Sequence, residues 1–576
     1  MRSVDIPSLF LHFKEQNLYV PIILSLYLIT WFKGIYGGFC IDDDLGLQQF
    51  SDKWRPEGKD KDNKIIPELL VDYYNQEVGK DAENKPVIKP WKNLSYNSFL
   101  GFPGAFMRWH RLQIGKKYQV IGETKIGHDV YGWVQSPMRH HVWSLIVYGI
   151  ALVLCYNFLS FRFGQTIAFS ATLLFAIHPV ASQCIVWISG INYVYCLTFL
   201  LANYNIFQLG LSYYWTIPLT ILLTSLASLS LLVGCFNFAI LYTLGYPWEA
   251  FSALIIGLIF MMKDGKGVVS FRRQEFKKQN MTSSITPNIR KPIVMLKTLW
   301  YYICIVIFPK RLGLYHTFGY HYSRKDEEPS AMFWFGLLSL IGMGFGFWYG
   351  DLITKFCIVW FLSYFLIFSN FMTANQFVVE RYIFIPSLAY CIIFGRYLYP
   401  YPPLFWLLIG FYTMRSIMHV WTYKDHVSFY TSNIMNFPNS EVAYGNLGCA
   451  YQQIGMSGTA FDFWMKATQI NPHYDVPWYN MHSLVKGAGQ IEQARDYLRN
   501  CMNAKIVHFK ETWDKEMKDL DNQILKKQAF ESLNKDLNDA VNAGKTDLIQ
   551  GIKKNMDILM QPGTIVQMGS APKATT

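Results

Sequence analysis

Charged residues are scarce in this 576-residue chain, since Asp, Glu, Lys and Arg together make up 16%. Soluble domains carry about 25% charged residues, so the composition excludes a wholly soluble enzyme. Aromatic residues make up 17% and hydrophobic residues 52%, which excludes a disordered scaffold. The sequence also lacks a Gly-rich phosphate loop, HExxH, GxSxG and protein-kinase motifs. These absences argue against a nucleotide-driven pump and a soluble nucleotide-sugar enzyme. The ten cysteines form no CxxC pair, so neither a structural zinc site nor a disulfide framework is expected.

Long apolar runs dominate the first three quarters of the chain. The first, from Leu18 to about Phe39, is longer than the core of a cleaved signal peptide and predicts a retained membrane helix. Ten more apolar segments, each near the ~20 residues that cross a bilayer, bring the expected number of spans to about eleven. They are 141–160, 165–180, 190–210, 215–233, 236–262, 296–309, 331–349, 352–370, 383–398 and 402–417. The intervening residues 40–140 predict one long extramembrane loop with short interfacial helices.

The uneven placement of basic residues predicts the orientation. Residues 263–295 hold eight Lys or Arg residues and only Asp264 and Glu275 as acids. Short loops rich in Lys and Arg stay in the cytosol, so the loop at 40–140 and everything after residue 418 are expected on the opposite side. We therefore expect an integral protein of the bacterial inner membrane or the endoplasmic reticulum. The net charge of +12 is explained by this placement, and no nucleic-acid partner is expected.

A repeat begins where the apolar runs end. Pro438 and Pro472 are 34 residues apart, which is the period of a tetratricopeptide repeat. Between them, small and aromatic residues stand at the pattern positions of that repeat: Tyr444, Leu447, Gly448, Tyr451, Ala460, Trp464 and Ala467. The next unit keeps Trp478, Gly489 and Ala494. We expect tetratricopeptide repeats over 418–506, a helical cap over 507–560 and a disordered tail over 561–576.

Three adjacent carboxylates follow the first apolar run directly: Asp42, Asp43 and Asp44. Like charges at a membrane surface raise the pKa of at least one carboxyl group. Such a cluster could act as a general base toward a hydroxyl group or hold a divalent cation. The alternative is a solvated acidic loop that orients the first helix.

Cationic and histidine side chains at the ends of apolar segments are the other candidates. His178 closes one segment and suits a polar cavity, although an interfacial anchor is the plainer interpretation. Arg381, which follows Glu380, could bind a lipid-linked phosphate in bidentate fashion. Its alternatives are a Glu380–Arg381 contact or headgroup anchoring. Lys310 and Arg311 are basic residues on the side predicted to lie opposite the cytosol, where few are expected. Their presence there favours a phosphate partner or a contact with lipid headgroups.

Five segments in order resemble one known family. They are the acidic residues after the first span, "FAIHPVASQCIVWISGIN", "KTLWYYICIVIFPKRLGLYH", "NQFVVERYIFIPSLAYC" and "PNSEVAYGNLGCAYQQIG". Together they are similar to the transmembrane and tetratricopeptide-repeat-containing protein O-mannosyltransferases and their bacterial relatives. The resemblance covers about 18–45 and 138–500.

The resemblance implies an all-α fold: a GT-C-like membrane helix bundle over 1–417, followed by the repeat domain. It implies transfer of a mannose-like sugar from a polyprenyl-phosphate donor to hydroxyl groups of an acceptor protein, which the repeats would bind. Asp42 and Asp43 take the place of the family's candidate base, with Asp44 beside them. His178 and Arg381 take the places of its histidine and arginine, with Lys310 and Arg311 as further phosphate ligands. No metal site and no certain cofactor follow from it, and a divalent cation stays open.

Several charged positions of the family are absent. A basic-acidic pair is replaced by Ile191-Asn192, the expected Ser-Lys-Glu segment reads Gly234-Cys235-Phe236, and the stretch at 136–139 is not Arg-Pro-Leu. These departures support a second hypothesis, a catalytically inactive membrane-anchored repeat scaffold that recruits a protein partner. A transporter is a weaker third hypothesis, since the sequence has no repeated half-structure.

Overall fold

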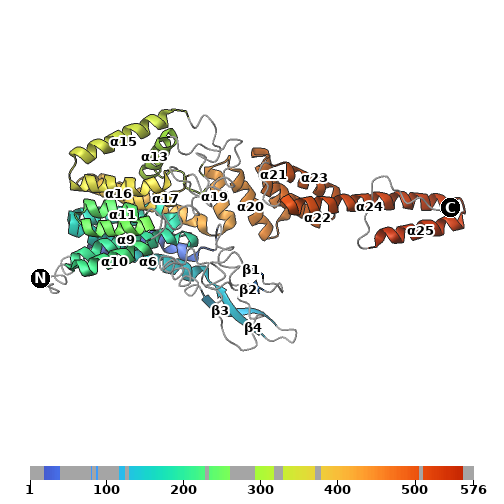
Figure 1. Cartoon of the computed structure of the whole chain (residues 1–576), viewed down its shortest axis with the longest axis horizontal. Helices are drawn as coiled ribbons and strands as arrows, with labels where there is room; N and C mark the ends of the chain where they lie inside the picture. Colours follow the sequence, from blue (N-terminus) through green and yellow to red (C-terminus); the bar gives the residue numbers. More distant parts are fainter. Residues whose placement is uncertain are drawn as a thin grey trace. The chain divides into compact units, whose positions relative to one another are not determined.

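The computed structural model divides the chain into two compact units, Met1–Pro438 and Asn439–Thr576. The structure describes residues 18–38, 40, 79–80, 86–87, 116–123, 129–227, 233–259, 292–314, 316, 328–369, 378–504 and 510–561. Among these residues the protein is predominantly helical, in agreement with the expected all-α class (Figure 1). The unit boundary lies later than the boundary expected at 417/418.

Helices make up almost all of the described first unit. They are α2 (Tyr19–Trp31), α6 (Pro137–Phe163), α7 (Gln165–Ile177), α8 (Ser182–Ile185), α9 (Ile191–Ile206), α10 (Tyr213–Leu226), α11 (Val233–Thr243), Pro247–Ile259, α13 (Pro292–Ile307), α15 (Ala331–Tyr349), α16 (Leu352–Phe368), α17 (Glu380–Leu398), α18 (Pro402–Val420) and α19 (His426–Asn436). Short 3-10 turns join several of them: η1 (Phe32–Tyr36), η5 (Pro179–Ala181), η6 (Ile188–Gly190), η7 (Phe207–Leu209) and η9 (Trp421–Tyr423). Every apolar segment predicted from the sequence contains at least one helix.

Three described helices are long and apolar enough to cross a membrane: Tyr19–Tyr36, Pro137–Phe163 and Ala331–Tyr349. Gln165–Ile177 and Pro179–Ile185, bent by 53° relative to each other, make a fourth if they count as one broken span. Four further apolar helices are shorter: Val233–Thr243, Pro247–Ile259, Pro292–Ile307 and Leu352–Leu366. The run at 236–262 is split at Gly245, whose φ is 86°. These helices are compatible with a membrane protein, and the number of eleven spans stays a prediction.

Two small antiparallel sheets lie within the loop predicted at 40–140. One pairs β1 (Gly79–Lys80) with β2 (Pro86–Val87). The other pairs β3 (Lys116–Glu123) with β4 (Asp129–Gln135), with a register shift between Val120 and Gly122. These strands were not expected, and the short interfacial helices predicted for this loop lie outside its described residues. The sequences of β3 and β4 contain β-branched and aromatic residues, which favour strands.

The core of the first unit surrounds α17, which packs against α7 and α16. Every residue of α7 from Ala168 to Ile177 is buried, as expected of a helix that is apolar on all sides. By contrast, Gly336 is the one buried residue of α15, a helix that runs along the edge of the bundle in Figure 1. α19 also belongs to this unit, because the Asn433 side chain accepts a hydrogen bond from Leu314 N (2.8 Å).

The second unit begins with two consecutive helix pairs, α20 (Glu441–Gln453) with α21 (Ser457–Ile470) and α22 (Asp475–Gly487) with α23 (Ile491–Asn503). Each pair turns at a glycine with positive φ, Gly455 at 83° and Gly489 at 79°. These glycines are 34 residues apart in the sequence, in agreement with the predicted period. Within the first pair, Trp464 Nε1 donates to Gly445 O at 3.1 Å. The arrangement is compatible with helical repeats.

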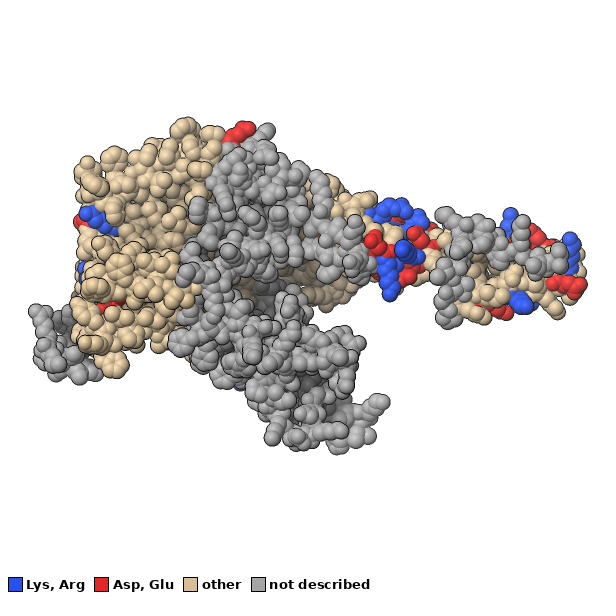
Figure 2. All heavy atoms as spheres, in the orientation of Figure 1, with Lys and Arg blue, Asp and Glu red and all other residues tan. Residues whose placement is uncertain are grey.

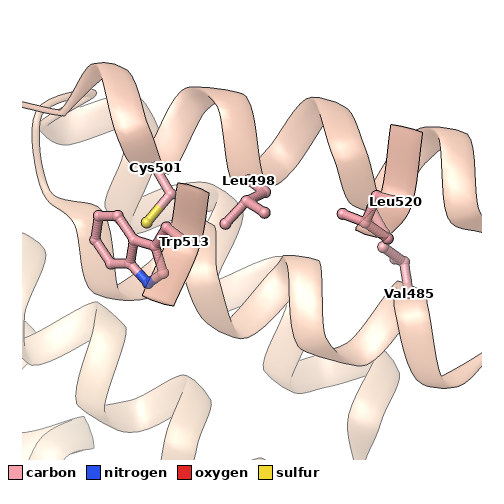
Figure 3. Close-up of a cluster of buried hydrophobic side chains, with 6 residues drawn as sticks. Val485, Leu498, Cys501, Trp513 and Leu520 are labelled. Carbon is pink, nitrogen blue, oxygen red and sulfur yellow. The ribbon is translucent and has the colours of Figure 1, made fainter. Parts of the chain in front are cut away.

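The second unit ends with α24 (Lys510–Asn542) and α25 (Thr546–Met560). The first turns of α24 cover the second helix pair, where Trp513 and Leu520 pack with Val485, Leu498 and Cys501 (Figure 3). These helices are rich in charge, and in Figure 2 most of the coloured acidic and basic atoms lie on the second unit. The visible described atoms of the first unit are mostly uncharged in the same view.

Candidate functional site

Several helix ends of the first unit meet at one end of its bundle. Gly38 N, just after η1, donates to Lys424 O beyond α18 (2.9 Å). Ser416 Oγ on α18 donates to Ile177 O at the end of α7 (2.7 Å). The end of α7 is linked in turn to the end of α13 by His178. Three of the segments that carry the family resemblance, at 175–192, 297–316 and 375–391, therefore lie side by side in the described part of the first unit.

A buried carboxylate, that of Glu380 in the first turn of α17, is the centre of this region. Its side chain is 0% exposed. Glu380 Oε1 accepts from Gly313 N at 2.6 Å and lies 2.9 Å from His316 Nε2. Its Oε2 accepts from the Gln183 side-chain amide. A buried charge is costly unless it is hydrogen-bonded, so these three donors account for its presence. We call these four residues the Glu380 cluster.

Gln183, on the short helix α8, completes the cluster by bridging two chain segments. Its amide group also donates to Gly313 O (3.0 Å), and its Oε1 accepts from Arg381 N (3.3 Å). The chain can approach this closely because of two glycines. A Cβ on Gly190 would lie 1.9 Å from Gln183 O, and a Cβ on Gly313 would lie 2.7 Å from Asn433 Oδ1.

Arg381 lies beside this cluster, with 9% of the residue exposed. The centre of its guanidinium group is 5.0 Å from the centroid of the Trp187 ring and 5.2 Å from that of Tyr382. Such distances are those of cation–π contacts. Arg381 also lines a cavity of about 10 Å³ with Tyr193 and Tyr364, which is room for about one water molecule.

His178, the other predicted phosphate ligand in the core, uses both ring nitrogens for the backbone. Its Nδ1 accepts from Val180 N at 3.3 Å, and Nε2 lies 3.0 Å from Val306 O. We therefore assign the proton to Nε2. The ring also packs on Tyr412, with 4.6 Å between centroids. His178 thus joins the break between α7 and α8 to the end of α13, and it is fully buried.

Lys310 and Arg311 are exposed in the turn after α13. This turn is fixed by Arg415, which the sequence analysis did not identify. Arg415 Nε donates to Pro309 O and a terminal nitrogen to Lys310 O, each at 3.0 Å. Three basic side chains therefore share one turn, which suits an anionic group such as a phosphate.

The three predicted catalytic residues, Asp42, Asp43 and Asp44, lie outside the described residues. Cys40, two positions before Asp42, is described and buried. Its Sγ donates to Tyr423 O at 3.4 Å, so the chain leaving α2 is attached to the same end of the bundle. Among the described residues no group of three or more His, Cys, Asp or Glu side chains is arranged to hold a metal ion.

Further buried polar groups at this end were also missed by the sequence analysis. His419 and Tyr423 are each about 2% exposed or less, and their rings meet edge to face at 5.4 Å. Neither His419 ring nitrogen has a hydrogen-bond partner among the described residues. In the sequence, His419 and Tyr423 are two ring-bearing residues just after the apolar segment 402–417, and no local pattern distinguishes them from their neighbours.

Comparison of the chain with family models, with characterised proteins and with solved structures gives no match. The chemistry that this end of the bundle can perform is therefore argued from the positions of its own side chains. It combines an anionic cluster, an arginine held by aromatic rings and an exposed basic turn. Such a set can neutralise a phosphate and hold a proton-accepting group nearby.

Proposed function

We propose that this protein is a GT-C-type membrane glycosyltransferase. It transfers a mannose-like sugar from a polyprenyl-phosphate donor to hydroxyl groups of an acceptor protein, on the lumenal or periplasmic face. One observation supports this most: three described segments that carry the resemblance and are far apart in the sequence converge on one end of the first unit. His178, Gly313 and Glu380 represent these three segments there.

In this proposal the reaction is an inverting displacement. Asp43, or Asp42 as the second choice, takes the proton of a Ser or Thr hydroxyl as the oxygen attacks the anomeric carbon. The bond to the polyprenyl phosphate breaks, and Lys310 and Arg311 neutralise the leaving group. Preorganised cations at a leaving group supply a large part of the stabilisation of a transition state. Arg381, positioned by Trp187 and Tyr382, is the third cation.

The proposed architecture has about eleven membrane spans and a domain of tetratricopeptide repeats. The helix pairs α20–α21 and α22–α23 would bind an extended segment of the acceptor protein, as short repeat arrays do. Binding there would raise the effective concentration of the acceptor at the membrane site.

The test is transfer of radiolabelled mannose from dolichyl-phosphate mannose to a synthetic Ser/Thr-rich peptide, with the full chain in proteoliposomes. Asp43→Asn and Arg311→Gln should each reduce transfer strongly. Arg396→Gln is the matched control, because Arg396 lies at the other end of α17 and pairs with Asp351 at 2.6 Å. Equal rates for Asp43→Asn and the native chain would refute the aspartate as the base.

The second candidate is a membrane-anchored repeat scaffold without catalytic activity, and two observations favour it. His178 has both nitrogens occupied by the backbone, and the cavity beside Arg381 has room for about one water molecule. A native chain that transfers no sugar, yet retains a bound protein through residues 439–560, would favour the scaffold.

A further inference from the structure

Tyr301, His316 and Glu380 form a continuous hydrogen-bonded array that the mechanism above does not use. His316 Nε2 lies 2.9 Å from Glu380 Oε1, and His316 Nδ1 lies 2.9 Å from Tyr301 Oη. The phenol comes from α13 and the carboxylate from α17. The imidazole therefore connects two groups that are 79 residues apart in the sequence.

The partners of Glu380 determine where the protons of this array lie. Glu380 Oε1 accepts from Gly313 N, and Oε2 accepts from the Gln183 amide. A carboxyl group with these donors is satisfied as an anion, which accepts and does not donate. His316 Nε2 therefore carries the proton that points to Glu380. His316 Nδ1 then holds a lone pair, and the Tyr301 hydroxyl donates to it.

The tyrosine end is the more exposed end of the array. His316 and Glu380 are both 0% exposed, whereas Tyr301 is half-buried. Arg311, in the exposed basic turn, is a charged group that acts on Tyr301 from among the described residues, as Glu380 does. The order hydroxyl, imidazole, carboxylate is the arrangement in which an oriented base activates a hydroxyl group.

We propose that these three residues are a proton relay whose outer end, Tyr301, receives the proton of the acceptor hydroxyl. The acceptor O–H bond breaks as its oxygen attacks the anomeric carbon, and the proton passes to Tyr301 Oη. The original Tyr301 proton moves at the same time to His316 Nδ1. The resulting imidazolium is paired with the Glu380 carboxylate, and the electron pair of the broken sugar–oxygen bond leaves with the phosphate. Tyr301 is then a catalytic residue, and His316 and Glu380 are positioning residues.

This assignment rests on the proposed glycosyl transfer but replaces Asp43 with Tyr301 as the base. Under the relay, Asp43→Asn should keep a rate close to native while Tyr301→Phe loses it, and the reverse result would favour the aspartate. The first experiment measures single-turnover transfer, again from dolichyl-phosphate mannose to the synthetic peptide, in H2O and in D2O. Tyr301→Phe should slow transfer about 10²- to 10⁴-fold, the usual contribution of an acid or base. It should also reduce the ratio of the rates in H2O and D2O, because the proton that moves from Tyr301 to His316 is gone. Tyr302→Phe is the matched control, because the Tyr302 hydroxyl accepts from Val379 N and should leave rate and isotope effect close to native.

The outcomes separate the two proposals. If the native chain is active and Tyr301→Phe keeps its rate and isotope effect, the relay is refuted while the glycosyl transfer stands. If the native chain transfers no sugar, the glycosyl transfer and the role of the relay in it are both refuted.

A second experiment tests the array without any activity. Solid-state NMR of the full chain with ¹⁵N-labelled histidine, with His316→Gln used for assignment, should show a neutral His316 ring protonated at Nε2. Tyr301→Phe should shift the Nδ1 signal to that of a nitrogen without a hydrogen bond, and Tyr302→Phe should not. A His316 ring protonated at Nδ1 would refute the relay whatever the activity.

Discussion

Substituting Gly313 by alanine tests whether the Glu380 cluster is as tightly packed as the structure indicates. The added Cβ would lie 2.7 Å from Asn433 Oδ1 and 3.0 Å from Phe437 Cε2. Asn433 cannot swing away freely, because its Oδ1 accepts from Leu314 N and its Nδ2 donates to Phe429 O. The strain must therefore displace the backbone of residue 313.

The expected cost follows from two contributions. Overpacking a rigid site costs about 1–3 kcal/mol. A displaced backbone also weakens the 2.6 Å hydrogen bond from Gly313 N to Glu380, which adds about 1 kcal/mol. At about 2 °C per kcal/mol for a large domain, Gly313→Ala should lower the unfolding temperature of the first unit by roughly 4–8 °C.

The assay is thermal unfolding of the detergent-solubilised full chain, followed by tryptophan fluorescence. Gly344→Ala is the matched control, because no atom lies within 4 Å of its added Cβ on α15. That change should stabilise the helix by about 0.5–1 kcal/mol. Asn433→Ala alone should also destabilise, because Leu314 N loses its acceptor. The double variant should cost less than the sum of the two, since the clash with Asn433 is gone.

Equal unfolding temperatures for Gly313→Ala and Gly344→Ala would contradict the packing described here. Strict additivity of Gly313→Ala and Asn433→Ala would contradict the assignment of the clash to the Asn433 side chain, even if both single variants are destabilised.

The second unit supports three further predictions. Trp513→Ala should lower the free energy of unfolding by about 3–5 kcal/mol, because it opens a cavity. It should also make α24 accessible to trypsin in the full chain, whereas Leu548→Ala, at an exposed position, should not. Partial burial raises the pKa of Glu516, but hydrogen bonds from Lys486 and His482 outweigh this effect. The pKa of Glu516 is therefore below its ordinary value of 4.5. The attachment of α24 should therefore be intact above pH 4.5 and weaken as the pH falls below it, and Glu516→Gln should remove this acid dependence of trypsin cleavage. Gly448→Ala should destabilise the first helix pair, measured by hydrogen exchange of α20, because its Cβ would lie 2.4 Å from the Trp464 ring; unchanged exchange would refute this.

The positions of the helices could be predicted from the sequence because each is a local pattern. Apolar runs located the described helices from α6 to α18 except the short α8, and Gly245-Tyr246-Pro247 located the break after α11. The period between Pro438 and Pro472 located the two helix pairs. The strands β3 and β4 were not predicted, because they lie in a polar stretch rich in basic residues, which is typical of a loop.

The partners within the candidate site could not be predicted. Glu380 appeared in the sequence as a neighbour of Arg381, whereas its hydrogen bonds reach Gln183, 197 residues away, and Gly313, 67 residues away. Gln183 itself has no distinguishing pattern. His178 was expected to face a polar cavity, and its nitrogens are instead used by Val180 and Val306. Such pairings depend on how helices pack, which no local pattern encodes.

The exposure of α15 has a consequence for how this helix tolerates change. Gly336 is the one buried residue of α15, so most positions of this helix contact what surrounds the bundle. Phe335, which stacks on Trp300 of α13, is an exception. One apolar side chain should therefore replace another there at little cost, and sequence drift should be fast along this helix and slow along α17. The outer face of α15 is accordingly the place where a fluorescent probe or a cross-linker can be attached without disturbing the interior.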